Sequence, residues 1–439
     1  MGNCFLYKRG FGGGFGGGGG GEDIPEIEKT ASGKVISILD SVEKPLKGLR
    51  LFGKTTQSGT PSPTAPVPLV SAGDGGSVDV TVAGKNLVDT NKFFEESVSF
   101  DDSTGRWTIY YDSGGYFKSL FSTSNGDNKD RDVKTLINIQ PNTKYTVRIN
   151  DWGINLLDTT AVEYDSYLSI AQHDAEGHYI TKNNISGASN YDRNGYTVTF
   201  TTRENTRYLD IRRYHRSYQV SFSSIQIELG DTYTGYEPYN GKTLTVQTPN
   251  GLPGVRVSDG GNYTDENGWQ WICDEVDFGR GKYVQRIGKT VFDGSSDEKW
   301  IAAGTNTSGK YRNRTTSLVN IILPVSSDDD IGGIMANILT GIPAGWSGTY
   351  GCNNGISVSA KGYVDCYHDN YNTDDITLWT SYLANNPITV IYALNTQIET
   401  DLTAEQLAAY AALRTLSPST TVYNDADSYM EVKYMAKGG

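Results

Sequence analysis

The chain has 439 residues, of which 37% are hydrophobic, and it carries a formal net charge of −13 at pH 7. This length predicts two to four domains, and the negative charge argues against nucleic acid as a partner, because phosphate binding requires clustered lysine and arginine. No apolar stretch reaches the length of a membrane span, so no membrane partner is expected.

Glycine (51 residues) and tyrosine (29) are abundant, and polar turn residues separate short apolar runs. This texture is typical of an all-β protein with many turns. The cysteines at 4, 273, 352 and 366 form no close pair of the zinc or redox type. A disulfide between Cys352 and Cys366 is one alternative, but we favour free buried thiols in a chain that folds in a reducing cytoplasm.

The chain starts with MGNCFLYKRG and continues as GFGGGFGGGGGG from Gly10 to Gly21. This N-terminal segment is basic but is not followed by an apolar stretch, so it is not typical of a secretory signal. Glycine has the largest backbone entropy to lose on ordering, which predicts a flexible N-terminal anchor or tether over residues 1–30. The alternative is a segment that becomes ordered only when it packs in an assembly.

The next segment, from Ala31 to Leu87, combines strands with a proline-rich crossing. Val35–Ile38 and Leu49–Phe52 are typical of strands, and Val78–Val82 alternates strictly, which predicts a strand with one buried face. Prolines 61, 63, 66 and 68 predict an extended segment between them that pairs with no strand.

From about residue 87 to 239 the chain is a succession of short alternating segments separated by turn clusters. The clearest are 106–111, 144–149, 167–172, 196–202, 207–212 and 219–228. Several short strands at regular spacing predict a β-sandwich or jelly roll, and about 150 residues are enough to bury a core of their own.

The C-terminal part returns to hairpins and then to one helix. Glycine pairs and Asn267-Gly268 predict tight turns between strands in residues 240–299. In DLTAEQLAAYAALRTLSPSTT, Thr403 and Gln406 form a capping box and Ser417-Pro418 ends the helical pattern. The predicted fold class is therefore mainly β, a multidomain β-sandwich or jelly-roll architecture with one short C-terminal helix at about 403–416.

The chain shows no G-x-S-x-G, H-E-x-x-H or EF-hand pattern. Asp274, Glu275 and Asp277 are the densest carboxylates beside aromatic residues, but Arg280 and Arg286 lie close enough to be their ion-pair partners. Alternate acids in a hairpin also face opposite sides. We therefore expect no enzymatic activity, no catalytic residue and no cofactor.

Histidines 173 and 178 flank the turn DAEG. A solvated loop explains this spacing better than a metal site does, so no metal is expected.

Glycan binding is the activity that the residues favour most. Aromatic faces stack on sugar rings while arginine, asparagine and aspartate bind hydroxyl groups in shallow sites. The candidate ligand-binding residues are Trp152, Tyr164, Tyr167, Arg213, Tyr214 and His215. The stretch LDIRRYHRSYQV around three of them also fits a solvated hairpin tip, and tyrosine-rich loops on a sandwich also bind proteins.

Four long segments carry a family resemblance. They are KPLKGLRLFGKTTQSGTPSPTAPVPLVSAGDGGSVDVTVAGKNL, GYEPYNGKTLTV, SDGGNYTDENGWQWICDEVDFGRGKYVQRIG and LTAEQLAAYAALRTLSPSTTVYNDADSYMEVKY. Together they resemble tail and minor structural proteins encoded by phages and prophages of Gram-positive, often gut-associated, bacteria.

The resemblance implies a virion protein of the tail, of the fibre or baseplate type, that is made in the host cytoplasm. Its implied partners are other phage structural proteins, further copies of itself in a homotrimer, and host cell-wall polysaccharide. The runner-up is a purely structural collar, baseplate or head-decoration component without receptor binding. In either role the chain is expected to be a non-enzymatic particle component.

The expected domain organisation follows from the resemblance and the strand pattern together. Residues 1–30 are the anchor, 31–86 form a β segment that packs with 240–299, 87–239 are an inserted carbohydrate-binding-like sandwich, and 300–439 are a C-terminal β domain. The stretch SSIQIELGDTYTGYEPY, which ends at Tyr239, is interpreted as the exit from the inserted sandwich. Its tyrosines, Tyr236 and Tyr239, are expected to pack at the seam instead of binding a ligand.

Overall fold

The structure is a computed structural model, and it describes residues 25–93, 98–109, 117–121, 130–151, 153–156, 167–184, 195–214, 218–305, 311–318, 320–321, 333–341, 355–358, 362–368, 375–426 and 428–438. Within these ranges the protein is mainly β, as the sequence predicts, and its strand pairs are antiparallel except for one parallel pair. Residues 1–24 of the predicted anchor lie outside the described residues, whereas residues 26–30 pair with residues 433–437 in a sheet, so the predicted flexible tether does not extend to residue 30.

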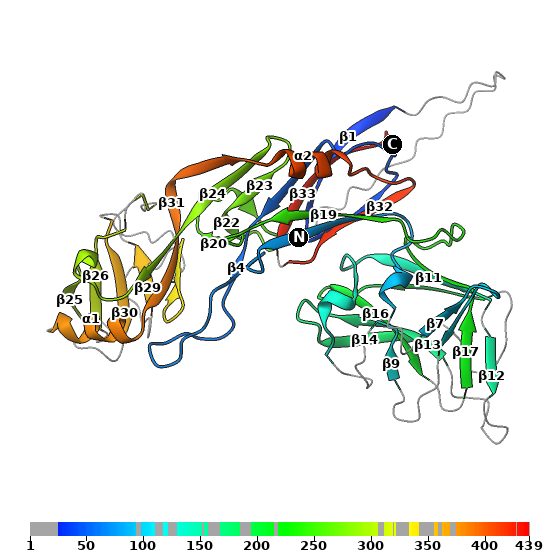
Figure 1. The fold of residues 1–439 in the computed structure, drawn as a ribbon, viewed down its shortest axis with the longest axis horizontal. Coiled ribbons are helices and arrows are strands. Elements are labelled where there is room, and N and C mark those ends of the chain that lie inside the picture. The colour runs from blue at the N-terminus through cyan, green and yellow to red at the C-terminus, as the bar shows by residue number, and fades with distance from the viewer. Residues whose placement is uncertain are drawn as a thin grey trace, which may run out of the picture.

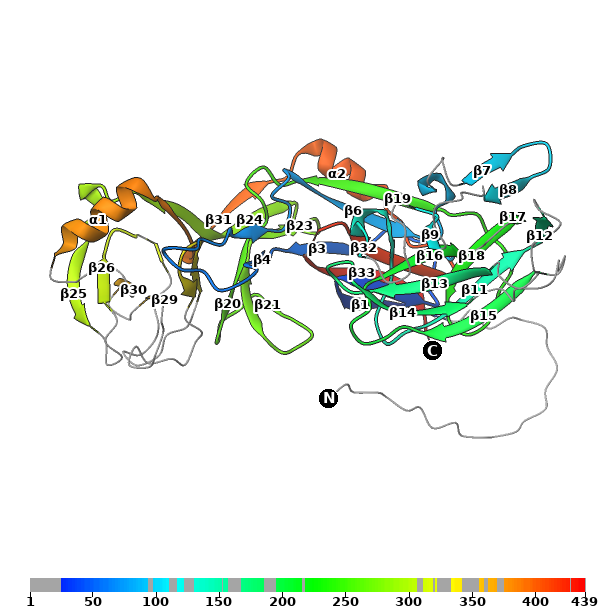
Figure 2. The same ribbon diagram turned by 90° about the horizontal axis from the view of Figure 1, so that it is seen from below.

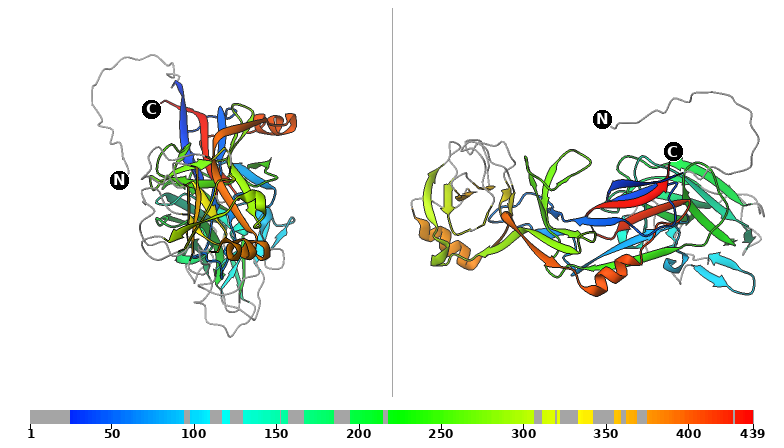
Figure 3. Two further views of the ribbon diagram at one scale, coloured as in Figure 1. Left: turned by 90° about the vertical axis from the view of Figure 1, so that its left-hand side faces the viewer. Right: turned by 90° about the horizontal axis from the view of Figure 1, so that it is seen from above.

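The molecule is elongated and has three parts (Figure 1). We call residues 87–239 the inserted module, residues 293–387 the C-terminal lobe, and the other described residues the body. The body lies between the module and the lobe in Figure 2 and in the right-hand view of Figure 3 as well. The domain boundaries expected from the sequence stay a prediction.

The body is a sandwich of two antiparallel sheets. The larger sheet has the order β1 (Glu26–Gly33), β33 (Tyr429–Lys437), β3 (Gly48–Phe52), β23 (Glu275–Asp277), β24 (Lys282–Phe292), β31 (Ile388–Asp401) and β27 (Ile334–Ala336). Its last strand, β27, comes from the C-terminal lobe. The smaller has the order β19 (Gly241–Gln247), β6 (Ser77–Ala83), β32 (Ser419–Asn424) and β2 (Val35–Leu39). Segments on both sides of the inserted module thus share one core.

Strict alternation in β6 buries Val78, Val80 and Val82 against Leu51 and Val432 of the larger sheet, as predicted for a strand with one core face. Small sheets extend the body. They contain β20 (Gly254–Val257), β22 (Gln270–Cys273) and β21 (Tyr263–Thr264), and the pair β4 (Thr55–Thr56) and β5 (Val70–Ser71).

The inserted module has its own sheets and its own core. One sheet contains β15 (Tyr196–Thr201), β11 (Lys144–Asn150) and β18 (Ser224–Leu229). A second contains β10 (Ile137–Asn138), β16 (Tyr208–Tyr214), β13 (Tyr167–His173) and β14 (Tyr179–Asn184), with β9 (Phe117–Ser119) beside β16. A third contains β12 (Gly153–Leu156), β17 (Tyr218–Phe222), β8 (Arg106–Ile109) and β7 (Val98–Asp101). Residues such as Tyr145, Ile170, Ile211 and Phe222 form the common core.

The C-terminal lobe packs a sheet and a helix around one tryptophan. The sheet contains β25 (Ile301–Thr305), β26 (Tyr311–Thr315), β30 (Val364–His368), β29 (Gly355–Val358) and β28 (Thr340–Gly341), and the helix is α1 (Ile376–Asn385). Trp379 of α1 is fully buried, and its ring stacks on His368 with the centroids 4.7 Å apart. The strands β24 and β31 run from the body into this lobe (Figure 1).

The predicted C-terminal helix is present as α2 (Ala404–Ala411), and both hydrogen bonds of the Thr403–Gln406 capping box form. It ends before the expected residue 416, because the chain turns to bury Leu413 in the body core. The helix α1 was not expected. Its buried residues Trp379, Tyr382 and Leu383 follow helical spacing, but over only 10 residues.

The proline-rich crossing is a strap, residues 57–69, that joins the body to the C-terminal lobe. The side-chain amide of Gln57 donates to the carbonyl oxygen of Ala336 at 2.8 Å, and the backbone N–H of Val67 donates to that of Asn337 at 2.7 Å. The hydroxyl of Tyr382 in α1 donates to the carbonyl oxygen of Pro63 at 2.7 Å. The strap contains no named strand, but it is not extended throughout as predicted, because Ser62 and Ala65 pair with each other across a turn.

The seam between module and body contains one of the two tyrosines expected there. The hydroxyl groups of Tyr239 and Tyr423 lie 3.5 Å apart, and burial raises the pKa of Tyr239. A Cβ at Gly241 would lie 2.1 Å from the Tyr239 hydroxyl, so glycine is needed for this close approach. Tyr236, in contrast, is 45% exposed, which contradicts its expected packing role.

We expect Tyr239→Ala to lower the free energy of unfolding by about 1–3 kcal/mol, because it removes a ring packed at the seam. Tyr236→Ala is the matched control and should leave stability nearly unchanged. Urea titration of the two variants beside the wild type measures both effects. Equal losses for the two substitutions would contradict this account of the seam.

Candidate functional site

The backbone of the inserted module brings two of the predicted ligand-binding residues side by side. Tyr167 in β13 lies directly opposite Tyr214 in β16, and Tyr214 also lies opposite Phe117 in β9. Residues opposite one another in an antiparallel ladder share one face of the sheet. We call this end of the β13–β16–β9 ladder, where three aromatic residues align, the ladder end.

The other predicted residues are placed less completely. Arg213 lies next to Tyr214 and opposite Leu168, so it belongs to the other face of the sheet. Trp152, Tyr164 and His215 lie outside the described residues. For Tyr167, Arg213 and Tyr214 the structure describes the backbone only.

The ladder end lies at the far end of β16 from a contact with the body. Arg207, just before β16 begins, forms an ion pair with Glu266 of the β21–β22 turn, with 2.9 Å between guanidinium nitrogen and carboxylate oxygen. Tyr214 closes the same strand, about 20 Å further along at the usual rise per residue. The strand direction therefore carries the ladder end away from this contact.

A buried ion cluster lies beside the ladder end on the same face of the sheet, because Asp210, Arg212 and Tyr214 occupy alternate positions along β16. The carboxylate of Asp210 accepts hydrogen bonds from the Ser119 hydroxyl at 2.5 Å and from the Nε atoms of Arg131 and Arg212, both at 3.1 Å. The side chains of Asp210, Arg131 and Arg212 are completely buried. The alternative of a solvated hairpin tip for LDIRRYHRSYQV is thus wrong for Arg212, whose side chain is buried in β16.

His173 completes the cluster as a neutral ring. Its Nδ1 lies 2.8 Å from the carbonyl oxygen of Gly177, to which it donates, and its Nε2 accepts from Arg212 at 3.0 Å. Burial lowers the pKa of His173, and the two guanidinium groups act in the same direction. The cluster therefore links β13, β16 and the Arg131 segment through buried hydrogen bonds and ion pairs.

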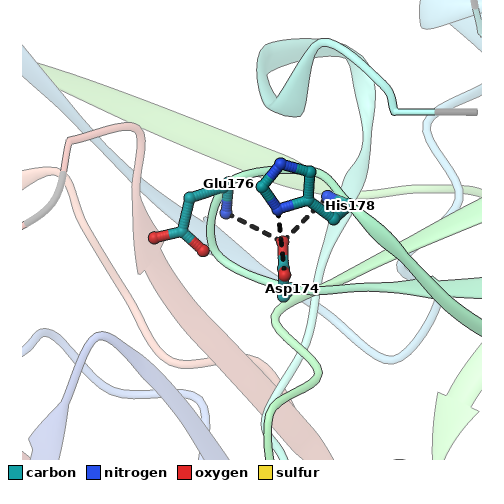
Figure 4. Close-up of side chains that lie close together, drawn as sticks. All are labelled: Asp174, Glu176 and His178. Carbon is teal, nitrogen blue, oxygen red and sulfur yellow. Dashed lines mark hydrogen bonds and ion pairs between the residues drawn. The ribbon is translucent and has the colours of Figure 1, made fainter. Parts of the chain in front are cut away.

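Asp174, Glu176 and His178 form the one group of possible metal ligands found among the described residues (Figure 4). The Asp174 carboxylate accepts from the backbone N–H groups of Glu176 at 3.1 Å and His178 at 2.8 Å, and lies 3.2 Å from the His178 ring. These bonds close the turn DAEG, and the His178 side chain is 58% exposed. We therefore interpret the group as a solvated turn.

The carboxylates considered for catalysis are engaged in the body sheet. Asp274 accepts from the backbone N–H groups of Arg286 and Ile287 at 2.7 and 2.8 Å, and from the Tyr283 hydroxyl at 2.8 Å. Burial raises the pKa of Asp274 to about 6. It holds the irregular ladder between β24 and β31, where the register shifts between Gln285 and Ile287.

Glu275 lies between two arginines. It accepts from Arg50 at 2.7 Å and from Arg286 at 2.8 Å. Burial opposes its ionisation, but these two guanidinium groups outweigh burial and lower its pKa. Both acids therefore have structural partners, and Arg280 pairs with Glu399 instead of with them.

Part of the buried cluster could have been predicted from a sequence pattern that our interpretation missed. In YLDIRRY, Leu209 and Ile211 alternate with Asp210 and Arg212, so one face of the strand is apolar and the other pairs opposite charges. Arg131, the second guanidinium, lies far away in sequence and carries no such pattern. Only the fold brings it to Asp210.

Comparison with known proteins gives no family for this chain: no protein-family model and no curated protein matches it. Among solved structures, accessory secretory proteins 1, 2 and 3 of Streptococcus pneumoniae are 13% identical over 34% of this chain and 96% of theirs, with a TM-score of 0.20. A glycosylation-associated protein complex from Streptococcus agalactiae is 8% identical over 35% of this chain and 48% of its own, with a TM-score of 0.22.

The VP2 subviral particle of infectious bursal disease virus is 8% identical over 94% of this chain and 81% of its own, with a TM-score of 0.17. TM-scores this low carry no argument about this chain. The class of this protein therefore comes from its own structure, which is that of a mainly β, multidomain protein with an inserted sandwich. Of the helices among the described residues, neither is long and apolar enough to cross a membrane.

Proposed function

We propose that this chain is a structural protein of a phage virion, placed in the tail as part of a fibre or baseplate. In this proposal its inserted module contributes to binding of host cell-surface glycan. The resemblance of its long segments to phage tail proteins motivates the proposal. One observation supports the proposed glycan binding. The inserted module has its own core, and its aromatic ladder end lies at the opposite end of β16 from the Arg207–Glu266 contact with the body.

The polar contacts at the seam support a presenting role for the module. Lys85 pairs with Glu237 at 2.7 Å, and Asn86 donates to the carbonyl oxygen of Glu237 at 3.0 Å, so the entering and leaving chains are tied to each other. These contacts and the Arg207–Glu266 pair fasten the module to the body, and the ladder end takes part in none of them. Loops on a rigid sandwich are a common place for recognition.

The proposed role is non-enzymatic. Its support is the engagement of Asp274 by backbone N–H groups and of Glu275 by two arginines, which leaves neither acid poised to transfer a proton to a substrate.

Binding of the full chain to purified host cell-wall polysaccharide tests the proposal. We expect Tyr167→Ala combined with Tyr214→Ala to weaken binding about tenfold or more, which corresponds to about 1.4 kcal/mol. Tyr236→Ala is the matched control, because Tyr236 is exposed but lies outside the ladder end. Absence of binding to any host-surface polymer would overturn the glycan-binding role and favour a purely structural collar, baseplate or head-decoration component.

We further propose that the chain assembles with other phage structural proteins and with itself as a homotrimer. Light scattering coupled to size-exclusion chromatography should then give three times the 47.9 kDa mass of one chain. A monomer at all concentrations would contradict a fibre or spike and indicate an accessory module.

A further inference from the structure

A groove of about 730 Å³ opens in the body, between the strap and the face of the β24–β31 ladder. Its floor contains the alternate residues Gln285, Ile287 and Lys289 of β24, with Thr389 and Ile391 of β31. Its walls are Pro66, Pro68 and Leu69 of the strap and, opposite, the turn at Pro249, Asn250 and Pro253. We call this cavity the strap groove, and its volume is within the range of small-ligand sites.

The walls of the strap groove are fixed by the fold. Hydrogen bonds from Val67 to Asn337 and from Gln57 to Ala336 hold the strap. On the opposite wall, a Cβ at Gly53 would lie 2.3 Å from the carbonyl oxygen of Pro253, so the two backbones touch. A preformed cavity binds with a smaller entropic cost than one that must be ordered by its ligand.

The polar groups of the strap groove are mostly uncharged. Asn250, Gln285 and Asn337 bring amides, which both donate and accept hydrogen bonds, and Tyr283, Thr389 and Ser71 bring hydroxyls. Among the described lining residues Lys289 is the one cation, and Asp74 and Asp274 are the two carboxylic acids. This set suits a neutral ligand rich in hydroxyl groups and disfavours a polyanion.

Two other ligand classes fit the strap groove less well. An extended peptide gains affinity by pairing with a free strand edge, but the floor is a sheet face, where residues 287–292 of β24 pair with residues 388–393 of β31. A purely apolar ligand would leave the exposed amide of Asn250 without a ligand partner, whereas the amide of Gln285 already donates to the carbonyl oxygen of Ile287 at 3.0 Å. The proline rings of the walls offer apolar faces for sugar C–H groups between these amides.

We propose that the strap groove is a second glycan-binding site, which takes a neutral oligosaccharide and is separate from the ladder end of the inserted module. The proposal rests on the proposed function, because glycan binding is the activity it extends. Asn250 and Lys289, both exposed at the groove, hydrogen-bond the sugar hydroxyls, and the prolines contact the ring faces. A chain with two such sites binds a long polysaccharide through both of them, which raises its overall affinity.

The experiment measures glycan binding by the full chain in four forms. The probes are cello-, malto- and N-acetylchito-tetrasaccharides, with polyglycerol phosphate as an anionic comparison. The forms are the wild type, Tyr167→Ala with Tyr214→Ala, Asn250→Ala with Lys289→Ala, and all four substitutions together. The matched control for the groove variant is Asn267→Ala with Lys29→Ala, which changes an exposed loop asparagine and an exposed strand lysine elsewhere.

We expect the ladder-end variant to keep residual binding to a neutral tetrasaccharide, and the groove substitutions to weaken that residual binding about tenfold or more. The control pair should leave it unchanged. Glycan binding that the groove substitutions do not alter would overturn the strap groove and leave the proposed function standing. Absence of binding by the wild type would overturn both, and Lys289-dependent binding of polyglycerol phosphate alone would overturn the neutral ligand class.

Discussion

Asp210→Asn should lower the free energy of opening of the inserted module by about 3–5 kcal/mol, the usual effect of removing one partner of a buried ion cluster. The carboxylate of Asp210 is shared by Arg131 and Arg212, and all three side chains are completely buried. Asparagine fills nearly the same space but leaves the two guanidinium groups without their shared negative charge. Hydrogen exchange of peptides from β13 and β16 measures this free energy of opening in the module itself. A local measurement is needed because a chain of several parts does not unfold in one two-state transition.

The control for this prediction is Asp231→Asn in the same module. Asp231 also pairs with a cation, Lys144, but both side chains are exposed, at 64% and 51%. We expect no measurable change in the protection of β13 and β16 from this substitution. Wild-type protection in the Asp210→Asn variant would show that the cluster does not hold the sheet.

Asp274→Asn should remove a pH dependence of stability between about pH 4 and 6. Burial raises the pKa of Asp274 from 3.8 to about 6, so the folded protein binds this proton more tightly than the unfolded chain does. The contribution to stability is therefore fully present below about pH 4 and is lost as the pH rises through 6, which amounts to about 3 kcal/mol. Urea titrations of wild type and variant at a series of pH values give the difference directly.

Glu275→Gln gives the opposite slope and serves as the contrast. Arg50 and Arg286 outweigh burial and lower the pKa of Glu275, so its contribution is present at neutral pH and is lost on acidification. The wild type should lose stability relative to Glu275→Gln as the pH falls, and gain stability relative to Asp274→Asn. If the stability of wild type and of Asp274→Asn changed with pH in parallel, the raised pKa of the buried Asp274 would be contradicted.

Local signals predicted the elements of this fold well where they are strong. The alternation of β6 gives one buried face, and the Thr403–Gln406 box caps α2. The end of α2 was not predictable from its own sequence, because burial of Leu413 in a distant core ends it. Pairings such as β1 with β33 join opposite ends of the chain, and no local pattern specifies them.

The candidate site was predictable only in part. The sequence placed Tyr167 in the alternating segment 167–172 and Tyr214 just after the segment 207–212. The register of β13 and β16 sets the two residues opposite each other. Chemistry that depends on distant contacts stayed hidden, as with Arg131 at Asp210 or the strap beside the β24–β31 ladder. Tyr236 shows the converse, because a seam aromatic in the sequence is exposed in the fold.

Hydrogen exchange of the full chain with and without purified host cell-wall polysaccharide tests the central claim most directly, because it locates the glycan on the molecule. The account predicts slower exchange at the ladder end, in residues 167–170 and 211–214. The Arg207 end of β16 should stay unchanged. Polysaccharide binding without protection at the ladder end, or no binding at all, would contradict the proposal that the inserted module presents the glycan site.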